Sequence, residues 1–279
     1  MKKKHSSWIY LVLGMMLFSL ITVSALPLVG SVVEGQQFTT NPNEKVITFD
    51  QQQLTIMEAE AAGYQKVLDR EPDNDTALNG LIKIRLQQKD LEQAIPPLTK
   101  LAQLHPEQTK YSTLLAQAKQ QTADYEGAAA VYNQVLRDHP GDIYALGGIT
   151  NLYLTQELPE RAIALLKRTI KLAAQTDNPK YNAINRKAVE LLLGELYTNQ
   201  ERYGEAIALY DQLAQADQAD FRPILAKALV LEKKGDLVAA QPVLQKAYVA
   251  APADYKDQIG GVMERVVQGI KVPETNLQK

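Results

Sequence analysis

Residues 125–140, YEGAAAVYNQVLRDHP, repeat the pattern of residues 91–106, LEQAIPPLTKLAQLHP, and both segments end in a proline. Pro72, Pro106 and Pro140 lie 34 residues apart, and Pro252 falls on a later repeat of this period once ten extra residues are allowed. A period of this length is typical of a helical repeat array and not of an enzyme fold. We therefore expect an array of small, similar units.

Aligning the chain on these prolines reveals further columns. Each column is an alignment position counted back from the proline. The position twelve residues before it holds a small residue or its stand-in, and the position eight before it holds a large one. A turn often precedes the position fifteen before it. The small column is Glu60, Ala94, Ala128, Ala162, Ala206 and Ala240; the large one is Tyr64, Leu98, Tyr132, Leu166, Tyr210 and Leu244; the third is Leu91, Tyr125, Pro159, Tyr203 and Leu237. A small residue facing a large one lets two helices approach closely, and a proline ends the second helix. Five full units follow, at 75–108, 109–142, 143–176, 187–220 and 221–254, with an insertion at 177–186.

Apolar residues at helical spacing, such as Leu146, Ile149 and Tyr153, predict another helix in the first half of each unit. The helix-turn-helix unit resembles the tetratricopeptide repeat (TPR) family. The residues that carry the resemblance best are Leu193, Gly194, Tyr197, Tyr203, Ala206 and Tyr210, with Tyr125, Ala128, Tyr132 and Pro140. Ile82 and Thr150 depart from its small position, and Ala174 and Gln218 replace its terminal proline. The resemblance covers about two thirds of the chain and implies an all-α helical solenoid.

The two ends of the array are expected to be caps. Residues 54–74 supply only the second half of a unit, and residues 255–270 read as a lone amphipathic helix before a tail at 271–279. Terminal units must close an otherwise exposed apolar face. The insertion at 177–186 either lengthens the flanking helices or forms a bump on the surface.

The pairs Gly147–Gly148 and Gly260–Gly261 lie inside expected helices. A glycine there costs about 1 kcal/mol and usually has a packing or functional reason. We expect close helix packing at both pairs, with room for a ligand as the alternative.

The N-terminus predicts a membrane anchor. A basic tail at 1–7, with Lys2, Lys3 and Lys4, precedes an apolar stretch at 8–33, and a transmembrane helix needs about 20 apolar residues. Cleavage after Val23-Ser24-Ala25, as in a signal peptide, is the alternative.

Charge predicts the orientation of this anchor. The first basic residue after it is Lys45, so the N-terminus is expected in the cytoplasm and the repeats in the periplasm or lumen, at a bacterial inner or thylakoid membrane. Retention of the folded array on the cytoplasmic face is the alternative. A polar linker at 34–53 could reach roughly 60 Å at about 3.4 Å per residue.

Several function classes find no support in the composition. The formal net charge is −2 with both signs dispersed, which gives no basic footprint for nucleic acid, and there is no cysteine for disulfides or lipid attachment. Zinc-protease, phosphate-loop and nucleophile-elbow motifs are missing. His105 and His139 stand one repeat apart, but two imidazoles without a third ligand do not make a metal site. We expect no enzyme activity, no cofactor and no metal.

The family resemblance implies a binding groove whose concave wall is lined by the first helix of each unit. The candidate peptide-binding residues stand at its fifth and ninth positions: Asn79, Lys83, Thr113, Gln117, Asn151, Leu191, Glu195, Leu225 and Leu229. Amides and ammonium groups can bind the backbone of an extended peptide, and the leucines can hold an apolar helix face. Alternatively, the last helix covers the leucines and the polar column is ordinary wet surface. A carboxylate clamp for chaperone tails is not expected, because the later basic pair of that motif is missing.

These features predict a non-enzymatic, membrane-anchored scaffold that binds proteins or peptides in its groove and supports the assembly or localisation of a membrane-associated complex. The layout also resembles the membrane-anchored TPR proteins of cyanobacteria and chloroplasts that assist photosystem assembly or bind protochlorophyllide oxidoreductase, although no single residue carries that likeness. The alternative is a cleaved, exported periplasmic chaperone or envelope-assembly factor.

Overall fold

The computed structural model describes residues 49–175 and 177–271, where the chain forms thirteen helices and no strand. The contacts divide the chain at Thr48, and the array from Phe49 onward is one compact unit. Within the described residues, no helix has both the length and the apolarity needed to cross a membrane. The predicted basic tail, anchor and most of the linker lie outside the described residues.

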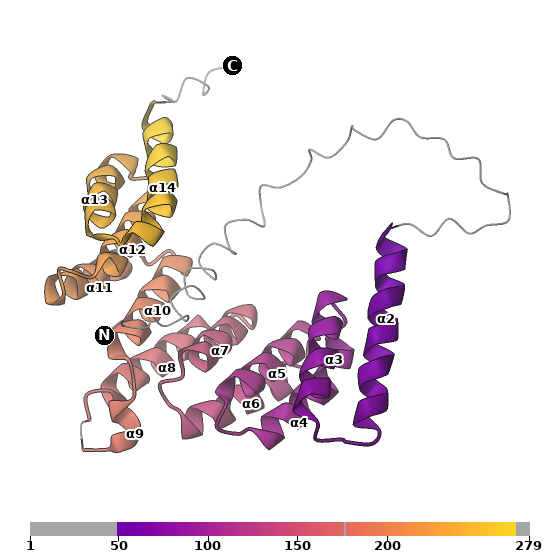
Figure 1. Ribbon diagram of the computed structural model, residues 1–279. Helices are drawn as coiled ribbons and strands as arrows, with labels where there is room; N and C mark the ends of the chain where they lie inside the picture. Colours follow the sequence, from indigo (N-terminus) through magenta and orange to yellow (C-terminus); the bar gives the residue numbers. More distant parts are fainter. Residues whose placement is uncertain (1–48, 176, 272–279) are drawn as a thin grey trace, which may run out of the picture. The chain divides into compact units, whose positions relative to one another are not determined.

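Ten of the helices form five consecutive pairs (Figure 1). The first helices of the pairs are α3 (Asp75–Gln87), α5 (Thr109–Gln121), α7 (Ile143–Thr155), α10 (Arg186–Asn199) and α12 (Phe221–Lys233). The second helices are α4 (Leu91–Leu104), α6 (Tyr125–Asp138), α8 (Pro159–Leu172), α11 (Tyr203–Ala216) and α13 (Leu237–Ala250). Each second helix packs on the first helix of its own unit and on that of the next. The core is therefore a continuous seam of small clusters, as expected for an all-α solenoid.

The small and large columns of the second helices form this seam. Ala94, Ala128, Ala162, Ala206 and Ala240 are all 0% exposed, and the large residues Leu98, Tyr132, Leu166, Tyr210 and Leu244 are at most 1% exposed. A methyl group at the closest point lets two helix backbones approach, and the large residue one turn later fills the space beside it.

The turn between the two helices is the same in every unit. Lys89, Ala123, Glu157, Glu201 and Gly235 occupy equivalent positions and all have a positive φ, between 57° and 86°. In the first unit, Lys89 N–H donates to Leu86 O at 3.1 Å and Asp90 N–H donates to Arg85 O at 2.8 Å. This pair of bonds closes a helix on a left-handed residue, for which glycine is the usual choice. Four of the five units hold that conformation without glycine.

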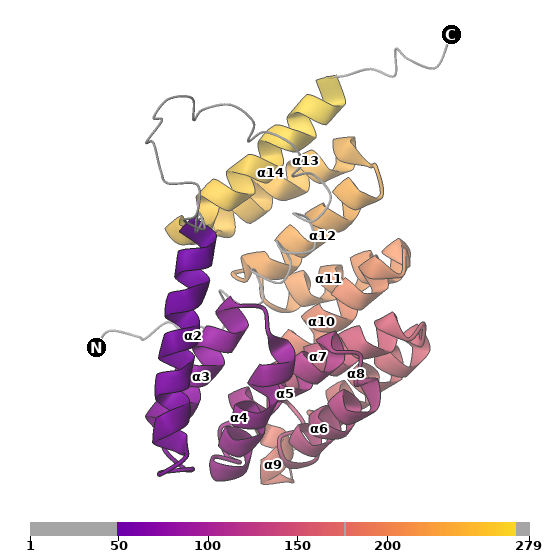
Figure 2. The same ribbon diagram turned by 90° about the vertical axis from the view of Figure 1, so that its right-hand side faces the viewer.

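Single helices flank the pairs. α2 (Phe49–Leu68) packs on α3, and α14 (Ala253–Lys271) lies beside α13 in both views (Figures 1 and 2). α2 begins at Phe49, inside the segment expected to be linker. Glu60 replaces the small residue of its column and is exposed, which suits a helix that packs on α3 alone among the helices of the described residues.

The insertion lengthens α10 by one residue, Arg186, and leaves α8 at the length of the other second helices. It forms the short helix α9 (Pro179–Asn182), and its Ile184 side chain is 7% exposed in the core cluster of the third and fourth units. Lys180 Nζ donates to the backbone oxygen of Arg137, and Ile184 lies against Gly141. The other units are joined by a short turn. Between the third and fourth units, the insertion takes the place of that turn and packs Ile184 into the core.

The glycine pairs differ from the expectation. A Cβ added at Gly148 would lie 2.3 Å from Cζ of Tyr132, whereas one added at Gly147, Gly260 or Gly261 would meet nothing within 4 Å. Close packing is thus confirmed for Gly148 and wrong for the other three. Gly194 is packed in the same way, because a Cβ added there would lie 2.5 Å from Cε1 of Tyr210.

Gly147 and Gly148 give a matched test of this packing. Gly148→Ala should lower the free energy of unfolding by about 1–3 kcal/mol, because the buried Tyr132 ring must shift. Gly147→Ala should raise it by about 0.5–1 kcal/mol, because alanine is the better helix former where space is open. Urea unfolding followed by circular dichroism measures both, and equal effects would contradict the close approach at Gly148.

A second test concerns the turn. Ala123→Gly should raise the free energy of unfolding by about 0.5–1 kcal/mol, because Ala123 has a φ of 64° that disfavours any side chain. Ala130→Gly, at an exposed position inside α6, is the control and should lower the stability by about 1 kcal/mol. If both changes destabilise the protein, the left-handed turn stores no strain.

Candidate functional site

The first helices lie closer together than the second helices. α5 contacts α7, α7 contacts α10, and α10 contacts α12, whereas the second helices of neighbouring units share no contact of comparable extent within the described residues. A stack that is tighter on one side curves toward that side. The face lined by the first helices, called the inner face below, is the candidate binding surface.

The polar candidates lie on the first three units of the inner face. Lys83 is exposed and makes no interaction with a described residue, and Gln117 is partly buried. The Asn79 side chain donates to Asp75 O at 2.8 Å, and Gln120 Nε2 donates to Asn151 Oδ1 at 2.8 Å, which joins α5 to α7. Thr113, in contrast, is 4% exposed and its hydroxyl donates to Thr109 O. This half of the face presents amides and one uncommitted ammonium group.

The leucine candidates pack largely inward. Leu225 is 9% exposed, and Leu229 packs against the core cluster that contains Ile259 of α14. Leu191 packs against the core cluster of the fourth unit. Leu225 therefore offers little surface to a partner, while Leu191 and Leu229 keep part of their surface accessible.

Glu195 lies among these leucines. It is partly buried and forms no hydrogen bond or ion pair with a described residue. Desolvation by burial raises the pKa of the Glu195 carboxyl, and the charge of Lys233 only partly opposes this. The Lys233 ammonium is directed to the end of α10, at 3.4 Å from Thr198 O and 3.3 Å from Asn199 Oδ1. The carboxylate is thus left without a neutralising partner, which suits it to accept a cationic group.

Residues that were not among the sequence candidates also bridge neighbouring helices of this face. They are Gln120, which reaches Asn151, Lys233, which reaches Asn199, and Arg265 of α14, which reaches Glu232 at 3.1 Å. Gln120 stands at the twelfth position of its unit, so reading that column would have found it. Lys233 and Arg265 are recognisable only from the packing of consecutive helices.

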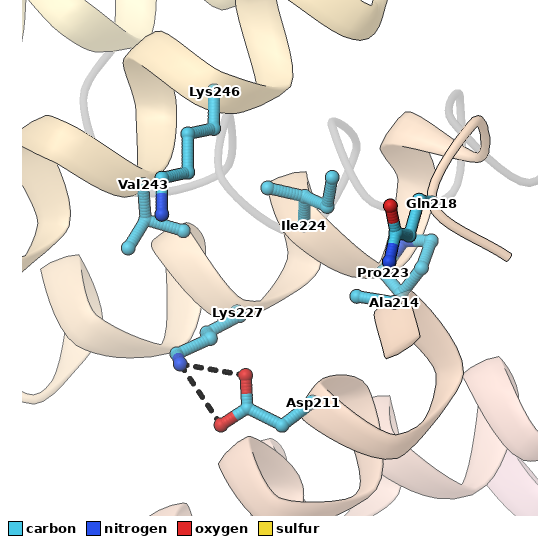
Figure 3. A pocket seen from close by; sticks show the side chains of 8 residues that line it. All are labelled: Asp211, Ala214, Gln218, Pro223, Ile224, Lys227, Val243 and Lys246. Carbon is cyan, nitrogen blue, oxygen red and sulfur yellow. Dashed lines mark hydrogen bonds and ion pairs between the residues drawn. The ribbon is translucent and has the colours of Figure 1, made fainter. Parts of the chain in front are cut away.

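A small pocket of about 360 Å³ lies elsewhere, among α11, α12 and α13 (Figure 3). The carboxylate of Asp211 there faces Lys227 Nζ at 2.6 and 2.9 Å, and Ile224, Pro223 and Val243 supply apolar walls. Because this acid and base neutralise each other, the pocket offers no uncommitted reactive pair. None of the nine candidate residues lines it.

The described residues contain no group of three or more His, Asp or Glu side chains that could hold a metal ion. His105 Nε2 lies 2.7 Å from Asp75 Oδ2 and so joins the two ends of its own unit. Lys187 and Asp217 make the corresponding contact in the fourth unit at 2.6 Å with the charges reversed. In these two units, the residue at this position links the start of the first helix to the end of the second helix.

Comparisons with known proteins agree with this architecture. Models described as tetratricopeptide repeat match residues 57–109, 121–188 and 191–223, which together exceed half of the chain. A search of curated proteins found no match.

Similar solved structures include yeast Tom70, at 15% identity and a TM-score of 0.52 over 77% of this chain and 44% of that one. A tetratricopeptide repeat protein from Parabacteroides merdae is also similar, at 15% identity and a TM-score of 0.49 over 81% of this chain and 91% of that one. YrrB, a TPR protein described as having an unusual peptide-binding site, shares 14% identity and a TM-score of 0.38 over 74% of this chain and 99% of that one. The chain spans less than half the length of Tom70, and such identities show the fold alone.

Glu195→Gln tests the desolvated carboxylate. Because the pKa of Glu195 is raised in the folded state, folding is weakened as the pH rises above the ordinary value of 4.5 toward the folded pKa. The variant should therefore be more stable than wild type at neutral pH, and the difference should vanish below pH 4.5. Urea unfolding over this range measures it, with Glu264→Gln at an exposed site as control. A gain that is independent of pH would assign the effect to packing.

Proposed function

The chain belongs to the tetratricopeptide repeat family, and from this premise we propose that it is a non-enzymatic scaffold, anchored in a membrane, which binds partner proteins or peptides on its inner face. By holding its partners there, it supports the assembly or localisation of a membrane-associated complex. The bound class of molecule is protein, since the face offers hydrogen-bonding amides, separated charges and partly accessible leucines.

One observation carries the proposal. The inner face holds two ionisable groups that form no hydrogen bond or ion pair with a described residue, Lys83 on α3 and Glu195 on α10. Neither is needed to close a helix or a unit, and burial of Glu195 opposes folding. Lys83 and Glu195 contribute nothing to the stability of the fold, and both lie on the concave inner face. Side chains of this kind are available to bind a partner.

The membrane part of the proposal is supported by the sequence. The apolar stretch at 8–33 is long enough for a span, and three lysines precede it. If the stretch is instead cleaved after Ala25, the same inner face would serve an exported assembly factor.

Site-directed crosslinking tests the inner face. A photoreactive phenylalanine at Lys83 or Gln117 should form crosslinks to partner proteins in intact cells, because both positions lie on the inner face and are at least partly accessible. The same amino acid at Gln212, exposed on α11, is the matched control and should give none of these products. Equal products at all three positions, or none at Lys83 and Gln117, would overturn the assignment of the binding face.

The location is tested separately, by intact mass and by protease digestion of sealed membranes from cells that carry a C-terminal tag. An uncleaved chain with a protected tag is expected, since the positive flank keeps the N-terminus in the cytoplasm. A chain that begins near Leu26 would establish the exported form and refute the anchor.

A further inference from the structure

The outer surface of α8 carries a concentration of positive charge. Arg161, Lys167, Arg168 and Lys171 are exposed and lie on one side of this helix, because residues three, four and seven apart share a face. We call these four residues the α8 stripe. It stands in contrast to the chain as a whole, whose formal net charge is −2.

The other units show that the fold does not require these charges. The equivalent positions are Gln93, Thr99, Lys100 and Gln103 on α4; Gly127, Asn133, Gln134 and Arg137 on α6; Glu205, Asp211, Gln212 and Gln215 on α11; and Ala239, Gln245, Lys246 and Val249 on α13. Each of the other four units has at most one cation there, and amides predominate. Since the same backbone accepts neutral residues elsewhere, the four cations of the third unit need another explanation.

Three of the four cations are uncommitted. Arg161, Arg168 and Lys171 make no hydrogen bond, ion pair or ring contact with a described residue. Lys167 lies 5.8 Å from the centre of the Tyr197 ring. Two acids lie near the stripe, and both already accept from Arg202: Glu160 at 2.9 Å, and Glu205, which also feels the charge of Lys167, at 2.6 Å. The positive field of the stripe is therefore directed to the solvent.

The shape of the stripe favours a lipid surface over a protein. Protein interfaces depend on packed anchors that fill pockets on the partner, and the apolar residue at the centre of this stripe is only Ala164. Attraction to anionic headgroups requires only clustered cations on flexible side chains, and each contributes about 1 kcal/mol near the surface. We propose that the α8 stripe holds the array against anionic phospholipids of the membrane in which the chain is anchored.

This inference rests on the proposed anchor, so the experiment separates the two. The chain has no cysteine, and Ala164→Cys therefore gives a single attachment site for an environment-sensitive fluorophore at the centre of the stripe. Ala208→Cys is the matched control, because Ala208 is the exposed equivalent residue on α11. Each full-length labelled protein is reconstituted into vesicles of phosphatidylcholine alone or mixed with phosphatidylglycerol.

The fluorophore at position 164 should report a less polar environment only in vesicles that contain phosphatidylglycerol, and the one at 208 should not respond. The response should disappear at about 1 M salt, where the screening length falls to about 3 Å. The triple change Arg161→Gln, Arg168→Gln and Lys171→Gln, which copies residues of the sister units, should lower the ratio of docked to undocked array on the order of 100-fold.

Failure of the anchor and failure of the stripe have different signatures. A chain that alkaline washing removes from both kinds of vesicle lacks the anchor. A chain that stays anchored but shows the same signal at 164 in both lipids, or equal responses at 164 and 208, overturns the stripe. If added poly-glutamate, and not phosphatidylglycerol, changes the signal at 164, the stripe is a docking site for an acidic protein segment and the lipid proposal is wrong.

Discussion

On each second helix, a buried small residue and a buried large residue stand one turn apart. This pair sets the distance between neighbouring helices, on which the array depends. Five alanines without any exposed surface allow the helices to approach, and five leucines or tyrosines complete the contact one turn later. The same pair of buried residues recurs on every second helix, so every unit offers its neighbour a similar packing surface. The curvature of the stack, and with it an inner face lined by first helices, follows from this repetition rather than from any single residue.

The turns show how strongly this packing constrains the backbone. A residue with positive φ recurs at the turn inside every unit, although four of the five units lack the glycine that would adopt it without strain. The energetic cost at each such residue, about 1–2 kcal/mol, is offset by the burial of the helices on both sides. Packing between helices therefore decides the turn conformation, and local preference does not.

The all-α repeat architecture could be predicted from the sequence because its residue pattern recurs at a fixed spacing along the chain. The small column and the prolines recur along the chain, and periodic signals add up even where Thr150 or Ala174 breaks one column. Features that occur once could not be read in this way. The insertion carries no periodic signal, so only the structure shows that Ile184 fills a core cluster. Gly147 and Gly148 are adjacent and chemically identical, and only the position of the Tyr132 ring distinguishes them.

The candidate site was less predictable, for a physical reason. A position in the repeat determines which way a side chain is directed, but its chemistry depends on neighbours from other units. Glu195 and Leu229 share the ninth position, yet one is a desolvated carboxylate and the other packs toward α14. In a solenoid each unit touches only its neighbours, so a group that opposes folding weakens one interface and leaves the others intact. A repeat can thus carry a desolvated group without an ion-pair partner, such as Glu195 on the inner face, at a cost that is confined to one interface.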